Sequence, residues 1–137
     1  MEMHNNVKVS RALSPVAAGT DNTAFVSEIL DTANYNNNEL AIAIGANTDA
    51  DATFTVLIEE SDAANMASQN AVADADLLGT EAEASFDYSD DNETRKIGYI
   101  GKKRYIRATI TPANNAAGNI YIAALWLQSG ARKVPVA

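Results

Sequence analysis

Short runs of alternating apolar and polar residues recur along this chain, a pattern typical of strands with one buried face. The clearest runs place these apolar side chains on one side of a strand: Leu40, Ile42, Ile44, Phe54, Val56, Ile58, Ile106, Ala108 and Ile110. Between Leu40, Ile42 and Ile44 lie Ala41 and Ala43, whose small side chains would let another surface approach closely. Residues 120–127 are apolar on both faces, which predicts either a central strand or a strand whose outer face another subunit covers.

Clusters of Asn, Asp, Ser and Gly separate the runs and predict turns, because their side chains bond to nearby backbone or tolerate left-handed conformations. These clusters lie at residues 34–38, 47–51, 89–92 and 114–119. Weaker strand signals lie at residues 25–30, 84–88 and 96–100. Residues 62–75, rich in alanine, predict one or two helical turns at most. Strands about 8 to 14 residues apart, joined by turns, predict a single-domain, all-β antiparallel β-sandwich that is jelly-roll-like.

The two ends of the chain have weaker periodicity than its middle. We predict an extended N-terminal arm at residues 1–21, a β-sandwich domain at residues 22–129 and a C-terminal tail at residues 130–137. Three apolar residues of the arm need a partner, which is either the edge of the domain's own sheet or a neighbouring molecule: Val7, Val9 and Leu13.

Composition narrows the classes of protein to which the chain can belong. At 137 residues there is room for one core, and without cysteine neither a disulfide framework nor a thiolate site is available. The longest apolar run is far below the roughly 20 residues of a transmembrane helix, and we see no signal peptide after Met1. We therefore expect a soluble protein made in a cytoplasm, with no membrane partner.

Charge is strongly segregated along the sequence. Residues 95–137 hold eight of the ten cationic side chains and no carboxylate, whereas residues 1–94 hold all 18 acids and two cations. Such segregation predicts two surfaces with different partners, or one surface that pairs with copies of itself. The net charge of −8 also argues against broad affinity for nucleic acid, because binding to phosphates needs a cationic footprint.

The segment with the strongest signal for a binding role is a basic cluster interleaved with Tyr99 and Tyr105. The cluster consists of Lys102, Lys103, Arg104 and Arg107. It could meet an acidic protein surface, form a plain solvated strand face, or hold single-stranded nucleic acid. The acidic surroundings favour the first, including the surface of a second copy. Together with the arm and the C-terminal tail, it gives a predicted protein interface of Val7, Val9, Arg11, Leu13, Lys102, Lys103, Arg104, Arg107, Arg132 and Lys133.

No catalytic, cofactor or metal residues are predicted. His4 is the single histidine and lies near a terminus, so a triad or a zinc site of ordinary type has too few ligands. Acids at residues 49–51, 74–76 and 87–93 could hold calcium, but none matches the calcium-loop pattern and we interpret them as solvated turn acids. The acid pairs at 59–60 and 81–83 could serve a glycosidase only beside a cleft with aromatic platforms. Gly98 and Gly101 lack the context of a phosphate cradle.

Three stretches of the sequence resemble one known family. They are TDADATFTVLIEESD at residues 48–62, ADADLLG at residues 73–79 and RKIGYIGKKRYIR at residues 95–107. Together they look like the decoration, or capsid-stabilising, auxiliary head proteins of tailed bacteriophages, over most of residues 7–135. The most distinctive element is the glycine-flanked turn that precedes the basic strand.

This resemblance implies a function and a location. Such proteins are small, largely β and often jelly-roll in fold, commonly trimeric, and seated at three-fold positions on the outer surface of a mature capsid. They stabilise the coat without catalysing a reaction. The expected partners are therefore the major capsid protein and further copies of this chain. The alternative is a carbohydrate- or receptor-binding β-sandwich of a phage tail or cell surface, which should display aromatics beside loop acids. We expect Trp126 to be buried between its apolar neighbours.

Overall fold

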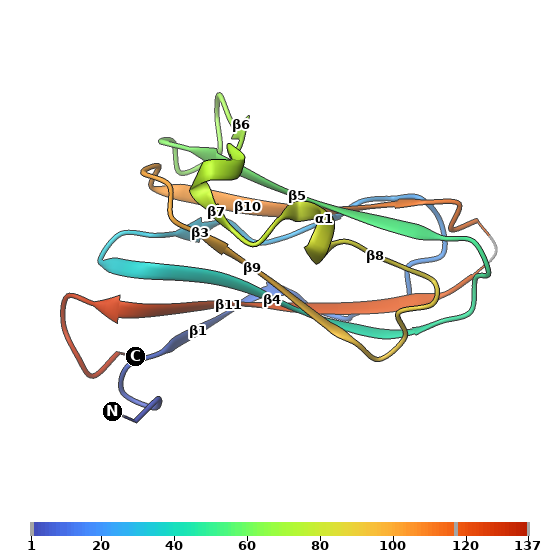
Figure 1. The fold of residues 1–137 in the computed structure, drawn as a ribbon, viewed down its shortest axis with the longest axis horizontal. Helices are drawn as coiled ribbons and strands as arrows, with labels where there is room; N and C mark the ends of the chain where they lie inside the picture. Colours follow the sequence, from blue (N-terminus) through green and yellow to red (C-terminus); the bar gives the residue numbers. More distant parts are fainter. Residues whose placement is uncertain (1, 117, 137) are drawn as a thin grey trace.

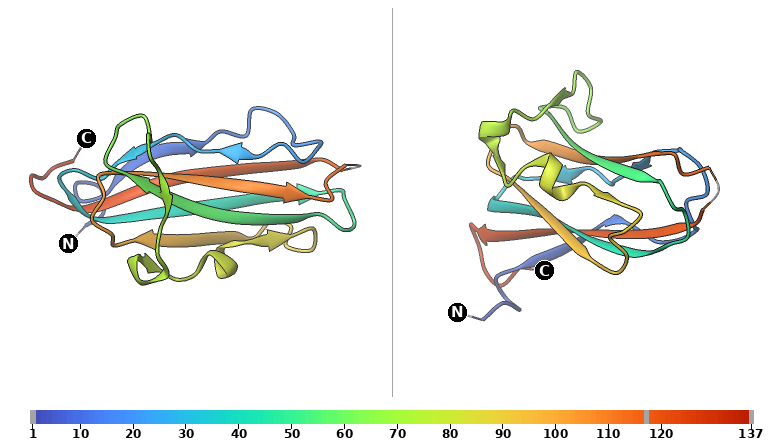
Figure 2. Two further views of the ribbon diagram at one scale, coloured as in Figure 1. Left: turned by 90° about the horizontal axis from the view of Figure 1, so that it is seen from above. Right: turned by 45° about the vertical axis from the view of Figure 1, so that its right-hand side comes forward.

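Two antiparallel sheets pack face to face in the computed structural model, which describes residues 2–116 and 118–136 (Figures 1 and 2). The five-stranded sheet has the order β1 (Lys8–Leu13), β11 (Ile120–Ala131), β4 (Tyr35–Asn47), β9 (Thr94–Tyr99) and β7 (Leu77–Leu78). The six-stranded sheet contains β2 (Phe25–Val26), β3 (Leu30–Asp31), β10 (Tyr105–Ala113), β5 (Thr53–Ser61), β6 (Asn70–Ala71) and β8 (Phe86–Asp87). The predicted all-β antiparallel sandwich is confirmed.

The strand order is that of a jelly roll. The first and last strands, β1 and β11, are neighbours in one sheet, while β2 and β3 both pair with β10 in the other. The chain passes between the sheets from β1 to β2, from β3 to β4, from β4 to β5 and at each step from β8 to β11. Two sheets exchanging strands in this way form the double Greek key of a jelly roll, which agrees with the jelly-roll-like sandwich expected from the sequence.

The core lies between the sheets and contains the residues that alternation placed inward. Leu40, Val56 and Ile106 are each at most 1% exposed, and the rings of Phe54 and Phe86 stack with their centroids 5.0 Å apart. The remaining predicted inward side chains are also buried: Ile42, Ile44, Ile58, Ala108 and Ile110.

Trp126 on β11 is 2% exposed, and its indole N–H donates to the carbonyl oxygen of Glu28 at 3.1 Å. Its predicted burial is confirmed, and its polar atom is satisfied inside the sandwich. Strand β11 itself lies between β1 and β4, so the prediction of a central strand for residues 120–127 is also confirmed.

Two local predictions were wrong. The α-helix α1 (Glu81–Ala84) lies outside residues 62–75, which instead hold turns, β6 and the 3-10 helix η1 (Asp74–Asp76). The helix begins where the Thr80 hydroxyl accepts the Glu83 N–H at 3.0 Å, a capping interaction that outweighs the short length. Of the asparagine cluster at 34–38, only Asn34 turns, and the rest extends β4 because Asn38 accepts a bond of 2.8 Å from Gln128 of β11.

The predicted N-terminal arm contains an edge strand. Residues 8–13 form β1 and pair with β11, so the apolar residues of this segment find the edge of the domain's own sheet. At the other end, β11 continues to Ala131 and so includes the first two residues of the predicted tail. Residues 25–30 form two short strands rather than one, since Ser27 interrupts the ladder and its hydroxyl accepts the Ala108 N–H at 2.9 Å.

Candidate binding surfaces

The outer face of the five-stranded sheet, formed by the outward side chains of β1, β11, β4, β9 and β7, is unusually apolar. In one row across the strands Val9 stands opposite Leu127, and in the next Arg11 stands opposite Leu125. Large apolar side chains on this face are about half exposed: Val9 at 58%, Leu125 at 45%, Tyr121 at 50% and Leu78 at 56%. Contiguous apolar surface of this kind is a common mark of an interaction site.

Small side chains line the middle of this outer face. Ala43 of β4 stands opposite Ala123 of β11, and both line a hollow of about 180 Å³ that is almost entirely apolar. Gly45 has no space for a side chain, because a Cβ there would lie 2.8 Å from the carbonyl oxygen of Tyr121. A second hollow of about 290 Å³, lined in part by Val7 and Ile100, continues the face toward β7. The small side chains thus leave the middle of the outer face hollowed.

Glu39 is the one carboxylate of β4 and lies within this apolar face, opposite Leu127 and Gly98. It is half-buried, and the loss of hydration raises the pKa of its carboxyl group, an effect that the positive charge of Lys96 partly offsets. The cation at the other edge, Arg11, forms an exposed ion pair of 2.9 Å with Glu28. Asn37 of β4 also donates to Ser129 of β11 at 3.0 Å, so polar side chains border the apolar part of this face.

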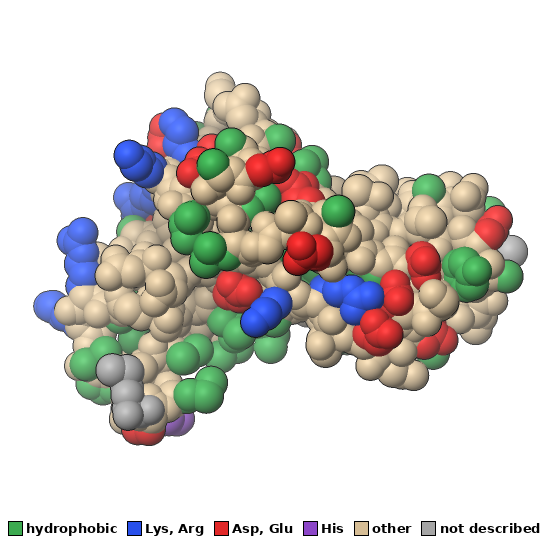
Figure 3. Space-filling view, in the orientation of Figure 1, with side chains coloured by type: hydrophobic (Ala, Val, Ile, Leu, Met, Phe, Trp, Pro, Cys, Tyr) green, Lys and Arg blue, Asp and Glu red, His purple; other side chains and the backbone are tan. Residues whose placement is uncertain are grey.

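A second surface, which we call the basic end, is formed by Lys8, Lys102, Lys103, Arg104, Arg132 and Lys133. Figure 3 shows cationic side chains along the left end of the molecule, whereas most of the acidic ones, together with other cations, lie over its middle and right half. Lys103 pairs with Asp62 at 2.6 Å, and Arg104 donates two bonds of 2.9 Å to Asp31. These bonds from Arg104 hold the pKa of Asp31 below its usual range.

A cavity of about 650 Å³ opens at the basic end. Lys8, Arg132 and Lys133 line it, together with Asp31 and Tyr35 of the β3–β4 region. The ammonium group of Lys8 lies 5.7 Å from the centre of the Tyr35 ring, a cation–π distance. The backbone is fixed here, since the Arg132 N–H donates to the Asn34 carbonyl at 3.1 Å. The arrangement suits an anionic group of a partner.

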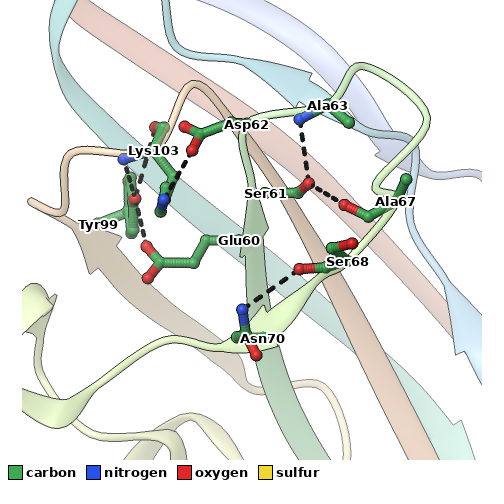
Figure 4. A network of polar contacts seen from close by, with 9 residues as sticks. All are labelled: Glu60, Ser61, Asp62, Ala63, Ala67, Ser68, Asn70, Tyr99 and Lys103. Carbon is green, nitrogen blue, oxygen red and sulfur yellow. Dashed lines mark hydrogen bonds and ion pairs between the residues drawn. The ribbon is translucent and has the colours of Figure 1, made fainter.

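Tyr99, which the sequence placed among the basic residues, is buried. Its hydroxyl donates to Glu60 at 2.6 Å and accepts the backbone N–H of Lys103 at 2.9 Å, as Figure 4 shows. Burial, and then the bond to Glu60, raise the pKa of the Tyr99 hydroxyl strongly, so it remains protonated. Tyr105 is half-buried, with the Arg104 guanidinium 5.2 Å from its ring centre. Tyr99 therefore ties β9 to β5 and presents no ring face to a ligand.

The structure divides the predicted interface residues between four places. Val7, Val9 and Arg11 belong to the outer face and its rim, whereas Leu13 packs against the core. The cations at positions 102–104 and 132–133 come together at the basic end. Arg107 lies apart on the other sheet, half-buried, where it donates to Gln69 of the 62–70 loop. A role for these residues in binding stays a prediction.

The acidic turns cap their own backbone. Asp91 accepts the Asn47 N–H at 3.0 Å, and Asp90 accepts the Asp87 N–H at 2.9 Å. Hydrogen bonds from Ser89 lower the pKa of the Asp87 carboxyl group. Within residues 2–116 and 118–136, no three His, Asp or Glu side chains converge as metal ligands would. Over the same residues, no helix has the length and hydropathy needed to cross a bilayer.

Sequence reasoning missed Lys8, Leu125 and Tyr121 as interface candidates. The apolar run at residues 120–127 held the signal for the last two, because a strand with one face in water does not need apolar side chains on that face. Lys8 had no local signal, since it meets Arg132 and Lys133 only through the pairing of the first and last strands.

The sequence matches no protein-family model and no curated protein. Among solved structures it is similar to XepA, an exported protein of PBSX, with a TM-score of 0.49 and 17% identity over 96% of this chain. It is also similar to the CBM22-1 and GH10 modules of endo-1,4-β-D-xylanase 10B from Clostridium thermocellum (TM-score 0.46, 12% identity, 96% of this chain). A third is the xylan-binding module CBM15 (TM-score 0.43, 10% identity, 97% of this chain and 96% of that one).

This chain spans 39% of the XepA chain and 26% of the xylanase chain. At these levels of similarity the three structures do not bear on function. The functional argument therefore rests on the surfaces of this chain.

Proposed function

We propose that this protein is a non-catalytic structural module that holds protein subunits together, and that the outer face of its five-stranded sheet is the main docking surface. The observation that carries the proposal is the continuous run of exposed Val9, Leu125 and Tyr121 over a lining of Ala41, Ala43 and Gly45. A lone soluble domain gains nothing from such a face, whereas a partner surface would remove it from water.

The specific form of the proposal is a capsid decoration protein of a tailed bacteriophage, as the three family-like stretches suggest. It would be made in the host cytoplasm and bind the outer surface of the mature capsid as a homotrimer at three-fold positions, in contact with the major capsid protein. Each contact needs only about 800 Å² per partner, because linked contacts within one oligomer multiply the effective affinity. The flat apolar face and the basic end would supply the two kinds of contact.

The test mixes the purified protein with expanded, undecorated capsids and measures the bound fraction by sedimentation. Ala43→Glu places a charge in the middle of the outer face and should abolish binding, because burying it unpaired is costly. The matched control, Thr55→Glu, places the same charge on an exposed outward position of the six-stranded sheet and should bind as the unaltered chain does. Equal binding by the two variants would rule out the outer face, and no binding by the unaltered protein would rule out the capsid.

One observation favours the alternative, a carbohydrate- or receptor-binding module. Tyr88 is 42% exposed beside the acidic turn at 87–91, and Tyr121 is 50% exposed on the outer face, so two aromatic rings are displayed. Because Trp126 is buried, its fluorescence would not report on a sugar. Calorimetry against a panel of soluble polysaccharides is the appropriate measurement. Heat of binding that disappears in Tyr121→Ala or Tyr88→Ala would establish this function in place of the first.

A further inference from the structure

The charge segregation of the sequence becomes a separation along the long axis of the folded molecule. The basic end lies beside the N-terminus, whereas the β4–β5 and β8–β9 loops lie at the opposite end, which we call the acidic end (Figure 1). Strand β4 runs from one end to the other and has 13 residues, so the ends are about 40 Å apart. The acidic end carries Asp49, Asp51, Asp87, Asp90, Asp91 and Glu93.

The cations of the basic end are only partly neutralised by the chain itself. Asp31 is engaged by Arg104 and Asp62 by Lys103. In the described part of the chain, no ion pair is formed by the other four cations of this end, which are Lys8, Lys102, Arg132 and Lys133. Three of these four line the 650 Å³ cavity, which therefore offers several cationic groups to one incoming anionic segment.

The acidic end is similarly unbalanced and is held in shape. Arg95 pairs here with Glu93 at 2.8 Å and with Asp90 at 3.3 Å, and the six acids of this end outnumber the cations of its two loops. The two loops are tied together, because the Tyr88 N–H donates to the Ala52 carbonyl at 2.9 Å and Asp91 accepts from Asn47 of β4. A preformed acidic projection loses little conformational entropy when it binds.

We infer that the basic end receives the acidic end of a second copy of this chain, so that copies associate head to tail. Each molecule carries one basic cavity and one acidic end. Identical copies therefore supply both surfaces of the contact in equal number, and no other component is needed. Opposite charges would fix the orientation and speed the encounter. A contact between two different surfaces is heterologous, so it closes into a ring or continues as a filament. The inference does not depend on the outer face or on the capsid.

The experiment uses two folded charge-reversal variants of the full chain and analytical ultracentrifugation at low ionic strength. Variant R132E/K133E keeps the acidic end, and variant D51K/E93K keeps the basic end. The unaltered chain of 14.5 kDa should form species larger than a dimer, whereas each variant alone should associate at least tenfold more weakly. An equimolar mixture has a single competent joint, so it should give a one-to-one dimer of about 29 kDa, twice the chain mass, and nothing larger.

Salt and a third variant complete the test. In about 0.5 M salt the Debye length is only a few ångströms, and the unaltered chain should return to smaller species. Lys96→Glu, a reversal on the outer face, should leave the association unchanged. Assembly that is insensitive to salt, assembly of either double variant as strong as that of the unaltered chain, or a mixture that fails to dimerise would each overturn the inference. An Ala43→Glu protein that no longer binds capsids but still forms salt-sensitive chains would separate the failure of one proposal from that of the other.

Discussion

The two outer faces of the sandwich share one fold and differ in what they present to solvent. On the five-stranded sheet, the outward positions of the central strand β11 are Tyr121, Ala123, Leu125 and Leu127, followed by the polar Ser129. On the six-stranded sheet, the outward positions of its long strands are largely hydroxyl-bearing or charged, namely Thr53, Thr55, Glu59, Tyr105, Arg107, Thr109 and Thr111, and the apolar exceptions on this face are Leu57 and the half-exposed Val26. The outer face of the six-stranded sheet is therefore mostly polar, as is usual for a surface in contact with water, whereas that of the five-stranded sheet is mostly apolar.

The chain also covers only one of the two outer faces. The 62–70 loop reaches Arg107 on the six-stranded sheet through Gln69, and Lys103 reaches Asp62 beside the same loop. Among the described residues, the outer face of the five-stranded sheet has side-chain bonds near its ends, where Arg11 meets Glu28 and Asn37 donates to Ser129, but no loop is bonded across its apolar middle. The comparison indicates that an exposed sheet face is not by itself a docking surface. A face marks a docking surface when its exposed side chains are apolar and no loop of the chain covers them.

The largest expected effect separates the inner and outer positions of β11. Trp126→Ala should lower the free energy of unfolding by about 3–5 kcal/mol, because it removes a buried ring and leaves a cavity. Leu125→Ala, one residue away on the outer face, should change it by no more than about 0.5 kcal/mol. Urea denaturation measures both. If Leu125→Ala were as costly as Trp126→Ala, the outer face would serve the stability of the domain and not a partner.

A smaller effect is expected where the six-stranded sheet is covered. Gln69→Ala should lower the free energy of unfolding by about 1–2 kcal/mol, because the half-buried Arg107 guanidinium loses its acceptor. Gln69→Glu keeps an acceptor oxygen and should retain the original stability. Thermal unfolding followed by circular dichroism compares them. Equal melting temperatures for all three proteins would mean that this loop does not protect the face beneath it.

The smallest effect concerns Glu39 on the apolar face. Because burial raises its pKa, ionisation of Glu39 opposes folding, and the stability associated with its protonated form is lost as the pH rises through the raised value. Glu39→Gln should therefore melt at a slightly higher temperature than the unaltered chain at pH 7. Below the ordinary pKa of about 4.3 the carboxyl is protonated in both states and the difference should vanish. A difference that stayed constant with pH would show that the carboxylate is well hydrated.

The alternation of apolar residues was enough to predict the sandwich, because each buried strand must present one face to the core. Phe54, Val56 and Ile58 illustrate this, since their burial depends only on the period of an extended chain. The helix at 81–84 was also accessible, through the Thr80 and Glu83 capping pair. The meeting of Lys8 with Lys133, like the bond from Tyr99 to Glu60, joins residues far apart in sequence and has no local signature.

The separation of charge between the two ends gives the sandwich an electric dipole moment along its longest dimension. Near any acidic surface this moment exerts a torque that turns the pole bearing both chain termini toward that surface (Figure 2). At physiological ionic strength the screening length is about 8 Å, so the rotation occurs only in the last nanometre of approach. The molecule would thus reach the acidic surface with its basic end first. The outer face of its five-stranded sheet would then stand at right angles to that surface, where a neighbouring molecule could contact it.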